Sequence, residues 1–235
     1  MWRVETSRLG RIVIPPFLPP GFGVFSTTLD LHGRITPDVE RDIAATIRER
    51  FALDTTLTTC HQIHSANVTR AQRASEWREC DACDALWSDD KHVALGIKVA
   101  DCLPITMVDP AHGIIANVHS GWRGAAQRIA AAAIDASAID ASASYAYLGP
   151  SIRVCCFEVG EEVVEQLAGD EVFVDRTRAK PHVDLAAFTI DILRARGFAG
   201  DRIFDSQLCT RCDGSIFHSY RRGSAGGRNL AIVAQ

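Results

Sequence analysis

The sequence predicts an α/β fold with mixed sheets. Short apolar segments of strand length alternate with segments whose apolar residues recur at helical spacing, and no regular strand–helix–strand repeat runs through the chain. We find no long linker, low-complexity run or internal repeat, and 235 residues are enough for one sizeable core. We therefore expect a single domain over residues 1–235.

The N-terminal part combines an extended segment with one helix. Proline pairs at 15–16 and 19–20 indicate extended chain that leads into a short strand at 23–27. Thr36 followed by Pro37 is typical of a helix start, with a capping side chain and proline at the first helical position. Apolar residues follow at near-helical spacing, at Val39, Ile43, Ile47 and Phe51.

The centre of the chain is rich in strands. Apolar runs predict strands at 93–99, 105–108 and 114–118. Glycines between 121 and 124 interrupt the strand pattern, and we expect a helix from about 125 to 136.

Strands and helices alternate through the C-terminal part. A strand at 145–148 ends at Gly149-Pro150, and helices are expected at 161–167 and 185–196, the second ended by Gly197. The last predicted strands cover residues 203–208, 216–220 and 230–233.

Charge and hydropathy argue against two classes of partner. A net charge of −4 gives no basic footprint for nucleic acid. No apolar run approaches the roughly 20 residues that span a bilayer, and the N-terminus lacks the apolar core of a signal peptide. We expect a cytoplasmic protein without nucleic-acid or membrane partners, and a monomer is favoured.

Eight cysteines need an explanation. Without a secretion signal, reduced thiols are expected rather than disulfides. The CxxC pairs at 80–83 and 209–212 together suggest a structural four-thiolate zinc site, but zinc-ribbon pairs usually lie within about 15–20 residues of each other. These two are much farther apart. We therefore expect both pairs, Cys60 and the adjacent Cys155-Cys156 to be structural thiols, the last two packed beside a turn.

Three segments place a metal-ligating side chain at the end of an apolar strand. They are HQIHSANV (61–68), VADCLP (99–104) and NVHSGWRG (117–124). Two histidines and one cysteine suit Zn²⁺ and leave its fourth position open, which is typical of catalytic sites. The residues alone leave His61 and His64 as alternatives, and a lone strand-end histidine is more often hydrogen-bonded or exposed.

Arginines beside glycines indicate candidate anion sites. Arg123 lies between Gly121 and Gly124 at a helix start, an arrangement that suits phosphate. A second candidate is the Gly-rich run 223–227, which is surrounded by Arg221, Arg222 and Arg228. A solvated basic turn is the alternative for this second group.

Three further side chains have two interpretations each. Asp84 is a candidate general base, although aspartate more often serves a turn. Trp87 and Phe217 are candidates for stacking on a planar substrate, although core packing is the commoner role for both.

Seven blocks in the same order resemble the laccase-domain, or YfiH, family of multicopper-oxidase-like proteins. They are HQIHSANV (61–68), CDALWS (83–88), ADCLPI (100–105), NVHSGWRGAAQRI (117–129), YLGPSIRVCCFEVG (147–160), LCT (208–210) and FHSYRRGSAGGR (217–228). ADCLPI followed by HSGWRG is the most distinctive pair. The chain departs from the family near its N-terminus, where Thr27 is followed by Thr28 instead of arginine.

The resemblance implies a fold and a site. The fold is an α/β/β/α layered sandwich with mixed sheets, similar to cysteine-hydrolase-like toxin domains. The implied zinc ligands are His64, Cys102 and His119, which selects His64 over His61. Cys102, His119 and Asp84 become the candidate catalytic residues, and the candidate substrate-binding residues are Arg123, Arg221, Arg222 and Arg228.

The resemblance also implies an activity. Family members are described as enzymes that phosphorolyse adenosine, inosine, guanosine and 5′-methylthioadenosine and deaminate adenosine, so zinc, a purine nucleoside and phosphate are the expected ligands. One alternative is an amidase that removes L-Ser from a UDP-MurNAc peptidoglycan precursor. Others are a copper-dependent polyphenol oxidase, since copper is possible at this site, and a binding protein without turnover.

Overall fold

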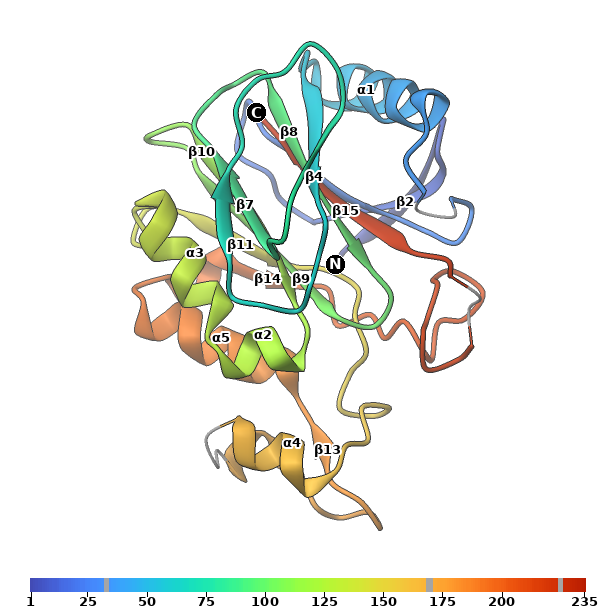
Figure 1. The fold of residues 1–235 in the computed structure, drawn as a ribbon, viewed down its shortest axis with the longest axis vertical. Helices are drawn as coiled ribbons and strands as arrows, with labels where there is room; N and C mark the ends of the chain where they lie inside the picture. The colour runs from blue at the N-terminus through green and yellow to red at the C-terminus, as the bar shows by residue number, and fades with distance from the viewer. Residues whose placement is uncertain (32–33, 168–170, 224–225) are drawn as a thin grey trace.

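Two mixed β-sheets are stacked face to face in the computed structural model, and helices cover both outer faces (Figure 1). The structure describes residues 1–31, 34–167, 171–223 and 226–235. The layers follow the order helix, sheet, sheet, helices. This arrangement confirms the predicted α/β fold class and its α/β/β/α layering.

The first sheet has seven strands, and helix α1 covers its outer face. In spatial order the strands are β1 (Arg3–Ser7), β2 (Gly10–Ile14), β3 (Gly23–Thr27), β15 (Asn229–Ala234), β8 (Val93–Val99), β4 (Thr56–Cys60) and β6 (Arg78–Cys80). Helix α1 (Pro37–Phe51) begins as predicted, since the Thr36 hydroxyl accepts a hydrogen bond from the Val39 N–H at 3.3 Å. Its buried Ile43 and Ile47 pack on the sheet.

The second sheet has six strands, and the remaining helices lie beside it. In spatial order the strands are β14 (Ile203–Asp205), β11 (Tyr145–Leu148), β9 (Leu103–Asp109), β10 (Ile114–Ser120), β7 (Ala85–Ser88) and β5 (Val68–Arg70). The α-helices on this side are α2 (Trp122–Ala126), α3 (Ile129–Ser137), α4 (Glu161–Gln166) and α5 (Leu185–Ala195). Smaller elements are the pair β12 (Val174–Asp175) and β13 (His182–Val183), and the 3₁₀ turns η1 (Glu171–Phe173) and η2 (Gly200–Arg202).

The strands of the core bury both faces, which explains their nearly continuous apolar runs. Along β8, Leu95 and Ile97 point between the two sheets, whereas Ala94 packs on the α1 side. Along β10, Ile115 points between the sheets and Val118 packs toward the helices. The space between the sheets is thus an apolar core, and the strand ends are left to carry polar side chains.

Three expectations about single elements were wrong. The helix expected at 125–136 is two helices, because Arg128 adopts a left-handed conformation (φ 56°) between α2 and α3. The strand at 203–208 ends at Asp205. The strand at 216–220 does not form, because the backbone N–H and C=O of His218 bond the Asn229 side chain at 3.0 Å each and not a neighbouring strand.

Within the described residues, no helix combines the length and the apolar character needed to cross a lipid bilayer.

Candidate active site

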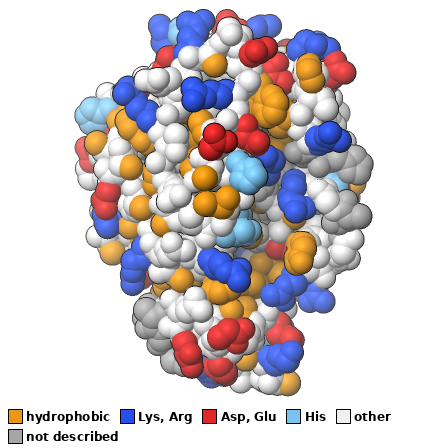
Figure 2. Space-filling model, viewed as in Figure 1, with side chains coloured by type: hydrophobic (Ala, Val, Ile, Leu, Met, Phe, Trp, Pro, Cys, Tyr) orange, Lys and Arg blue, Asp and Glu red, His pale blue; other side chains and the backbone are white. Residues whose placement is uncertain are grey.

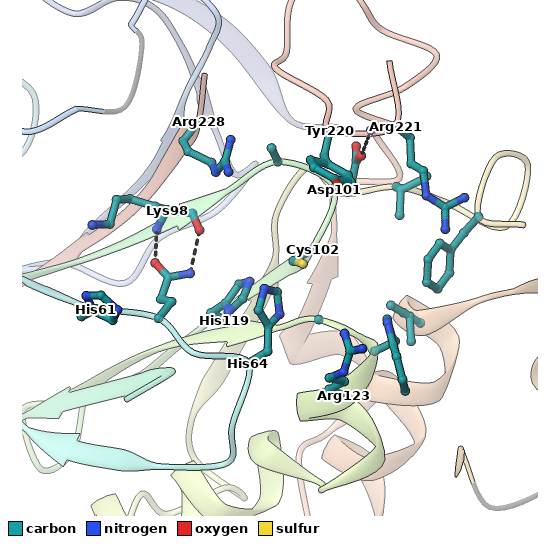
Figure 3. Close-up of a pocket in the computed structure, with 17 residues that line it drawn as sticks. His61, His64, Lys98, Asp101, Cys102, His119, Arg123, Tyr220, Arg221 and Arg228 are labelled. Atoms are coloured by element: carbon teal, nitrogen blue, oxygen red, sulfur yellow. Dashed lines mark hydrogen bonds between the residues drawn. The ribbon is translucent and has the colours of Figure 1, made fainter. Parts of the chain in front are cut away.

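The β9–β10 hairpin brings two of the predicted metal ligands together. The strands are antiparallel, and their register pairs Leu103 with Ser120 and Pro104 with His119. Cys102 immediately precedes β9, so it lies beside the end of β10 that carries His119. His64 comes from the loop between β4 and β5 and reaches the same edge (Figure 3).

The three side chains are close enough to share one ion. One ligand atom each from His64, Cys102 and His119 lies within 4.8 Å of the other two. The imidazole rings of the two histidines have centroids 4.8 Å apart and meet edge to face. His119 is buried, Cys102 is half-buried and His64 is exposed.

Gly121 keeps the space beside these ligands open. A Cβ atom at this position would lie 2.9 Å from Nδ1 of His64 and 3.0 Å from Sγ of Cys102. Any larger residue would therefore push against both ligands. Two imidazoles and a thiol around an open cradle fit a Zn²⁺ ion with a free coordination position.

Asp84 connects the loop that carries His64 to His119. Its carboxylate is fully buried and accepts hydrogen bonds from the backbone N–H groups of Ile63 (3.2 Å), His64 (3.0 Å) and Ser65 (2.6 Å). It also accepts from the Ser65 hydroxyl and from Nδ1 of His119, each at 2.8 Å. With its Nδ1 donating, His119 presents Nε2 as a metal ligand, the usual role of a carboxylate behind a ligating histidine.

Electrostatics couple Asp84 and His119. Burial raises the pKa of Asp84, but hydrogen bonds from His119 and Ser65 outweigh it and hold the pKa well below its ordinary value. Burial lowers the pKa of His119, whereas hydrogen bonds to Asp84 and Cys102 raise it to about 9. Burial, together with the nearby His119, lowers the pKa of His64. A cation entering the site must displace the His119 proton.

Two non-glycine residues at the site have left-handed backbone. His64 has φ 60°, and Asp101, next to Cys102, has φ 86°. Such conformations are held only where surrounding contacts dictate them. The Asp84 carboxylate does this at His64. At Asp101, the carboxylate accepts from Thr210 Oγ1 at 2.6 Å and from the Arg221 backbone N–H at 2.7 Å.

The side chains of His64, Cys102 and His119 face a cavity of about 660 Å³, which is within the range of small-molecule sites. Figure 2 shows histidine, lysine and arginine side chains around a hollow on this face. The charged groups that line the cavity are mainly cationic: Lys98, Arg123, Arg221 and Arg228, against the carboxylate of Asp101. The aromatic side chains of Trp122, Phe157 and Tyr220 also line it.

The cavity includes three of the four predicted arginines. Arg123 lies 4.3 Å from the Trp122 ring centroid, and Arg221 donates to the Glu158 carbonyl at 2.9 Å. Arg222 is not among the described lining residues. Its guanidinium donates to the backbone carbonyls of Thr210 (2.9 Å), Arg211 (3.2 Å) and Phe217. The geometry therefore gives Arg222 a structural role instead of substrate contact.

The other candidate residues lie outside the three-ligand group. Phe217 is fully buried in the interior, and Trp87 packs against the helix-side core, so neither of them stacks in the cavity. Asp84 does not reach the cavity surface and positions His119 instead. His61 lines the cavity but lies outside the three-ligand group. Residues 224–225 of the Gly-rich run lie outside the described residues.

Sequence reasoning missed the aromatic wall and the positioning role of Asp84. Trp122 and Tyr220 stand next to predicted arginines, and Phe157 follows the Cys155-Cys156 pair. Their positions beside candidate site residues were the only available signal, since apolar side chains in the sequence look alike in a core and in a cavity.

The chain is similar to several known proteins. A family model described as multi-copper polyphenol oxidoreductase laccase matches residues 30–235. Adenosine deaminase RL5, from an unknown prokaryotic organism, is 36% identical over 187 residues, which cover 74% of this chain and 71% of that protein. Purine nucleoside phosphorylase YlmD of Geobacillus stearothermophilus is 30% identical over 194 residues, which cover 75% and 71%.

A solved structure supports the fold. The crystal structure of the Bacillus licheniformis hypothetical protein YfiH superposes with a TM-score of 0.78 at 22% identity, covering 91% of this chain and 92% of that one. At this identity the likeness concerns the fold alone.

Proposed function

The chain belongs to the multi-copper polyphenol oxidoreductase laccase family, which includes the YfiH proteins, and from this premise we propose that it is a zinc-dependent purine nucleoside enzyme. Its reactions would be deamination of adenosine to inosine and phosphorolysis of adenosine, inosine, guanosine and 5′-methylthioadenosine. Relatives named adenosine deaminase and purine nucleoside phosphorylase support activity on nucleosides.

The observation that carries the proposal is a three-ligand group at the wall of a cationic, aromatic cavity. His64, Cys102 and His119 would hold the ion, and two imidazoles with one thiolate favour zinc among the common divalent cations. When bound, the ion would polarise a substrate group and make water a stronger nucleophile at neutral pH. Copper also binds imidazole and thiolate, so metal analysis decides between them.

The remaining groups of the cavity suit the other parts of a nucleoside and phosphate. Arg123, Arg221 and Arg228 supply donors that match phosphate oxygens. Trp122 and Phe157 provide apolar faces against which a purine ring packs. Asp84 keeps the tautomer of His119 fixed throughout.

The two proposed reactions are separated by their need for phosphate. Purified zinc-loaded protein is incubated with adenosine, with and without phosphate, and the products are separated by chromatography. Deamination consumes water and yields inosine and ammonia in both samples. Phosphorolysis yields free base and ribose 1-phosphate only with phosphate present. If neither inosine nor free base forms, the proposal is wrong.

Arg228→Gln tests the phosphate site separately. Arg228 lines the cavity, and its guanidinium donates a hydrogen bond to the Gly227 carbonyl at 2.8 Å. We expect phosphorolysis to fall more than deamination, with the loss appearing in the KM for phosphate. An equal loss of both reactions would instead mean that Arg228 binds the nucleoside.

One feature favours a second candidate function, an amide hydrolase with Cys102 as nucleophile. His119 hydrogen-bonds Asp84, and its ligand atom lies within 4.8 Å of the Cys102 thiol, so thiol, imidazole and carboxylate follow one another in series. This is the arrangement in which an oriented histidine takes the proton of a nucleophilic thiol. The expected substrate is an amide such as L-Ser on the UDP-MurNAc precursor.

Metal dependence separates the two candidates. A thiol nucleophile would keep its activity in the chelator-treated protein and lose it on alkylation by iodoacetamide. The zinc enzyme would lose its activity with the chelator and regain it with Zn²⁺.

A further inference from the structure

Two turns bring together four cysteines that do not belong to the three-ligand group. Cys155 and Cys156 lie on a turn at 154–156. Cys209 directly precedes a turn at 210–212 that contains Cys212, and its carbonyl accepts from the Asp213 N–H at 2.9 Å. A bridge between Ser151 and Cys209 holds the segments side by side, with the Ser151 N–H bonded to the Leu208 carbonyl at 3.2 Å. Packing thiols were expected at Cys155 and Cys156, whereas the structure leaves Cys155 exposed and Cys156 half-buried.

The distances between the sulfur atoms match those between the ligands of a tetrahedral metal ion. Sγ of Cys155 lies 3.7 Å from Sγ of Cys156 and 3.7 Å from Sγ of Cys212, and Sγ of Cys156 lies 3.3 Å from Sγ of Cys212. Ligand atoms of all four cysteines lie within 4.8 Å of one another. Tetrahedral zinc at about 2.3 Å from each thiolate separates the sulfurs by about 3.8 Å. All four are free thiols.

Packing does not explain the cluster. Cys155 and Cys212 are exposed, Cys156 is half-buried, and only Cys209 is buried. The cysteines of the other CxxC pair, Cys80 and Cys83, are by contrast both buried in the apolar core between the sheets. Exposed thiols gain little from hydrophobic burial, so their convergence points to a ligand.

Arginine side chains lie beside both turns. Arg178 donates to the Cys155 carbonyl at 2.8 Å, and Arg222 donates to the carbonyls of Thr210 and Arg211 within the second turn. These cationic side chains beside both turns offset part of the negative charge that four thiolates bring to one metal ion.

We propose that Cys155, Cys156, Cys209 and Cys212 form a second metal site that binds one thiophilic divalent cation of the zinc class. Four thiolates complete a tetrahedral coordination sphere, so this ion is structural and leaves no position for substrate. Binding displaces the thiol protons, and each sulfur then donates an electron pair to the ion.

A metal ion in this cluster would stabilise the segments that support Asp101 in the cavity wall. The Ile152 N–H donates to the Asp101 carbonyl at 2.9 Å, and the Thr210 hydroxyl donates to the Asp101 carboxylate at 2.6 Å. Both segments of the cluster therefore contact the residue that precedes Cys102. The Arg221 backbone completes this contact set (Figure 3).

Metal content of variants tests the proposal. The full chain is purified with Zn²⁺ in excess, freed of loose metal and measured by elemental analysis. We expect two zinc per chain in the wild type, and one each in Cys102→Ala and in the double variant Cys209→Ser/Cys212→Ser. Cys83→Ala is the matched control from the other CxxC pair and should keep two. A wild type with one zinc, lost in Cys102→Ala and kept in the double variant, overturns the proposal.

A second measurement does not depend on the double variant folding. Co²⁺ is titrated into ion-free Cys102→Ala, which retains the four thiols but lacks the thiolate of the cavity. We expect one equivalent of Co²⁺ to give an intense near-ultraviolet sulfur-to-cobalt charge-transfer band and to protect four thiols from alkylation. Absence of the band, or a disulfide among these four cysteines in freshly purified protein, overturns the proposal.

Discussion

The three-ligand group in the cavity and the four-cysteine cluster both gather donors for soft cations, but they are built differently. The first combines two imidazoles with one thiol, is supported by the buried carboxylate of Asp84 and opens on a cavity of about 660 Å³. The second has four thiols on two turns. Three protein ligands leave a zinc position for chemistry, whereas four fill it. The number of donors, more than their type, thus separates a reactive site from a structural one.

The two groups also differ in the backbone conformations and hydrogen bonds that keep their side chains in place. The cavity group depends on left-handed backbone at His64 and Asp101, which other residues must stabilise. The cluster depends on two adjacent turns joined by backbone hydrogen bonds. Substitutions in the first group should therefore act mainly on turnover, and substitutions in the second mainly on stability.

The largest effect is expected from Cys102→Ala. Loss of a direct ligand should reduce turnover beyond the roughly 10–100-fold typical of residues that only support ligands. The measurement is the rate of inosine formation together with zinc content. Undiminished deamination by Cys102→Ala would remove the basis for assigning catalysis to this group, whatever the metal content of the cluster.

Asp84→Asn should have the next largest effect. The amide offers one acceptor oxygen where the carboxylate now accepts from His119 and from the Ile63–Ser65 segment, so His119 loses its fixed orientation. We expect zinc affinity and turnover to fall by about 10–100-fold. Affinity is measured by competition with a chromophoric chelator.

The pH dependence of the same variant gives an independent check. In the ion-free protein, the His119 proton competes with the cation below a pKa of about 9. Removing the Asp84 charge lowers this pKa, so the pH at which zinc binding is half-maximal should move down even though the plateau affinity falls. A midpoint that moves upward contradicts the role assigned to Asp84.

The sequence predicted much of the cavity group because its ligands stand at strand ends. Strands at 93–99, 105–108 and 114–118 were visible as apolar runs, and an antiparallel hairpin brings the start of one strand to the end of the next. The strand-end segments made Cys102 and His119 candidates, and the family resemblance named them as ligands. The choice of His64 over His61 came from the family resemblance, and the structure groups His64 with the other two.

The cysteine cluster could not be predicted in the same way. Its two halves lie on irregular turns, whose approach depends on the Ser151–Cys209 bridge and not on a strand pattern. Spacing within the chain pointed to CxxC pairs alone and gave no reason to join Cys155 to Cys212. The strand expected at 216–220 failed for a related reason, because a side chain, Asn229, satisfies the backbone there.

An intermediate effect, on stability, is expected from Cys209→Ser/Cys212→Ser. Zinc present at about 1,000 times its Kd stabilises a folded protein by about 4.1 kcal/mol. At about 2–4 °C per kcal/mol for a chain of this size, the variant should lose about 8–16 °C in Tm relative to zinc-loaded wild type. Thermal unfolding is followed by circular dichroism.

The control compares the Tm of each variant with zinc bound and after a chelator has removed the zinc. Cys102→Ala should keep a zinc-dependent Tm because its cluster is intact. Adding Cys209→Ser/Cys212→Ser to Cys102→Ala should abolish that dependence, because neither group of ligands is then complete. A triple variant whose Tm responds to zinc as much as that of Cys102→Ala would mean that the cluster does not stabilise the fold through a metal.

The smallest effect is expected from Cys83→Ala. Cys83 lies with Cys60 and Cys80 in the apolar core between the sheets, where a hydrogen bond with Cys83 and burial both raise the pKa of Cys60. Removing one buried sulfur should cost about 1 kcal/mol and leave metal content and turnover unchanged, because this group fills space. Unfolding in urea measures the loss of stability, elemental analysis measures the metal content, and the rate of inosine formation measures turnover. If zinc content falls in Cys83→Ala, burial in the apolar core does not separate packing cysteines from metal ligands in this fold, and the contrast between the two CxxC pairs is lost.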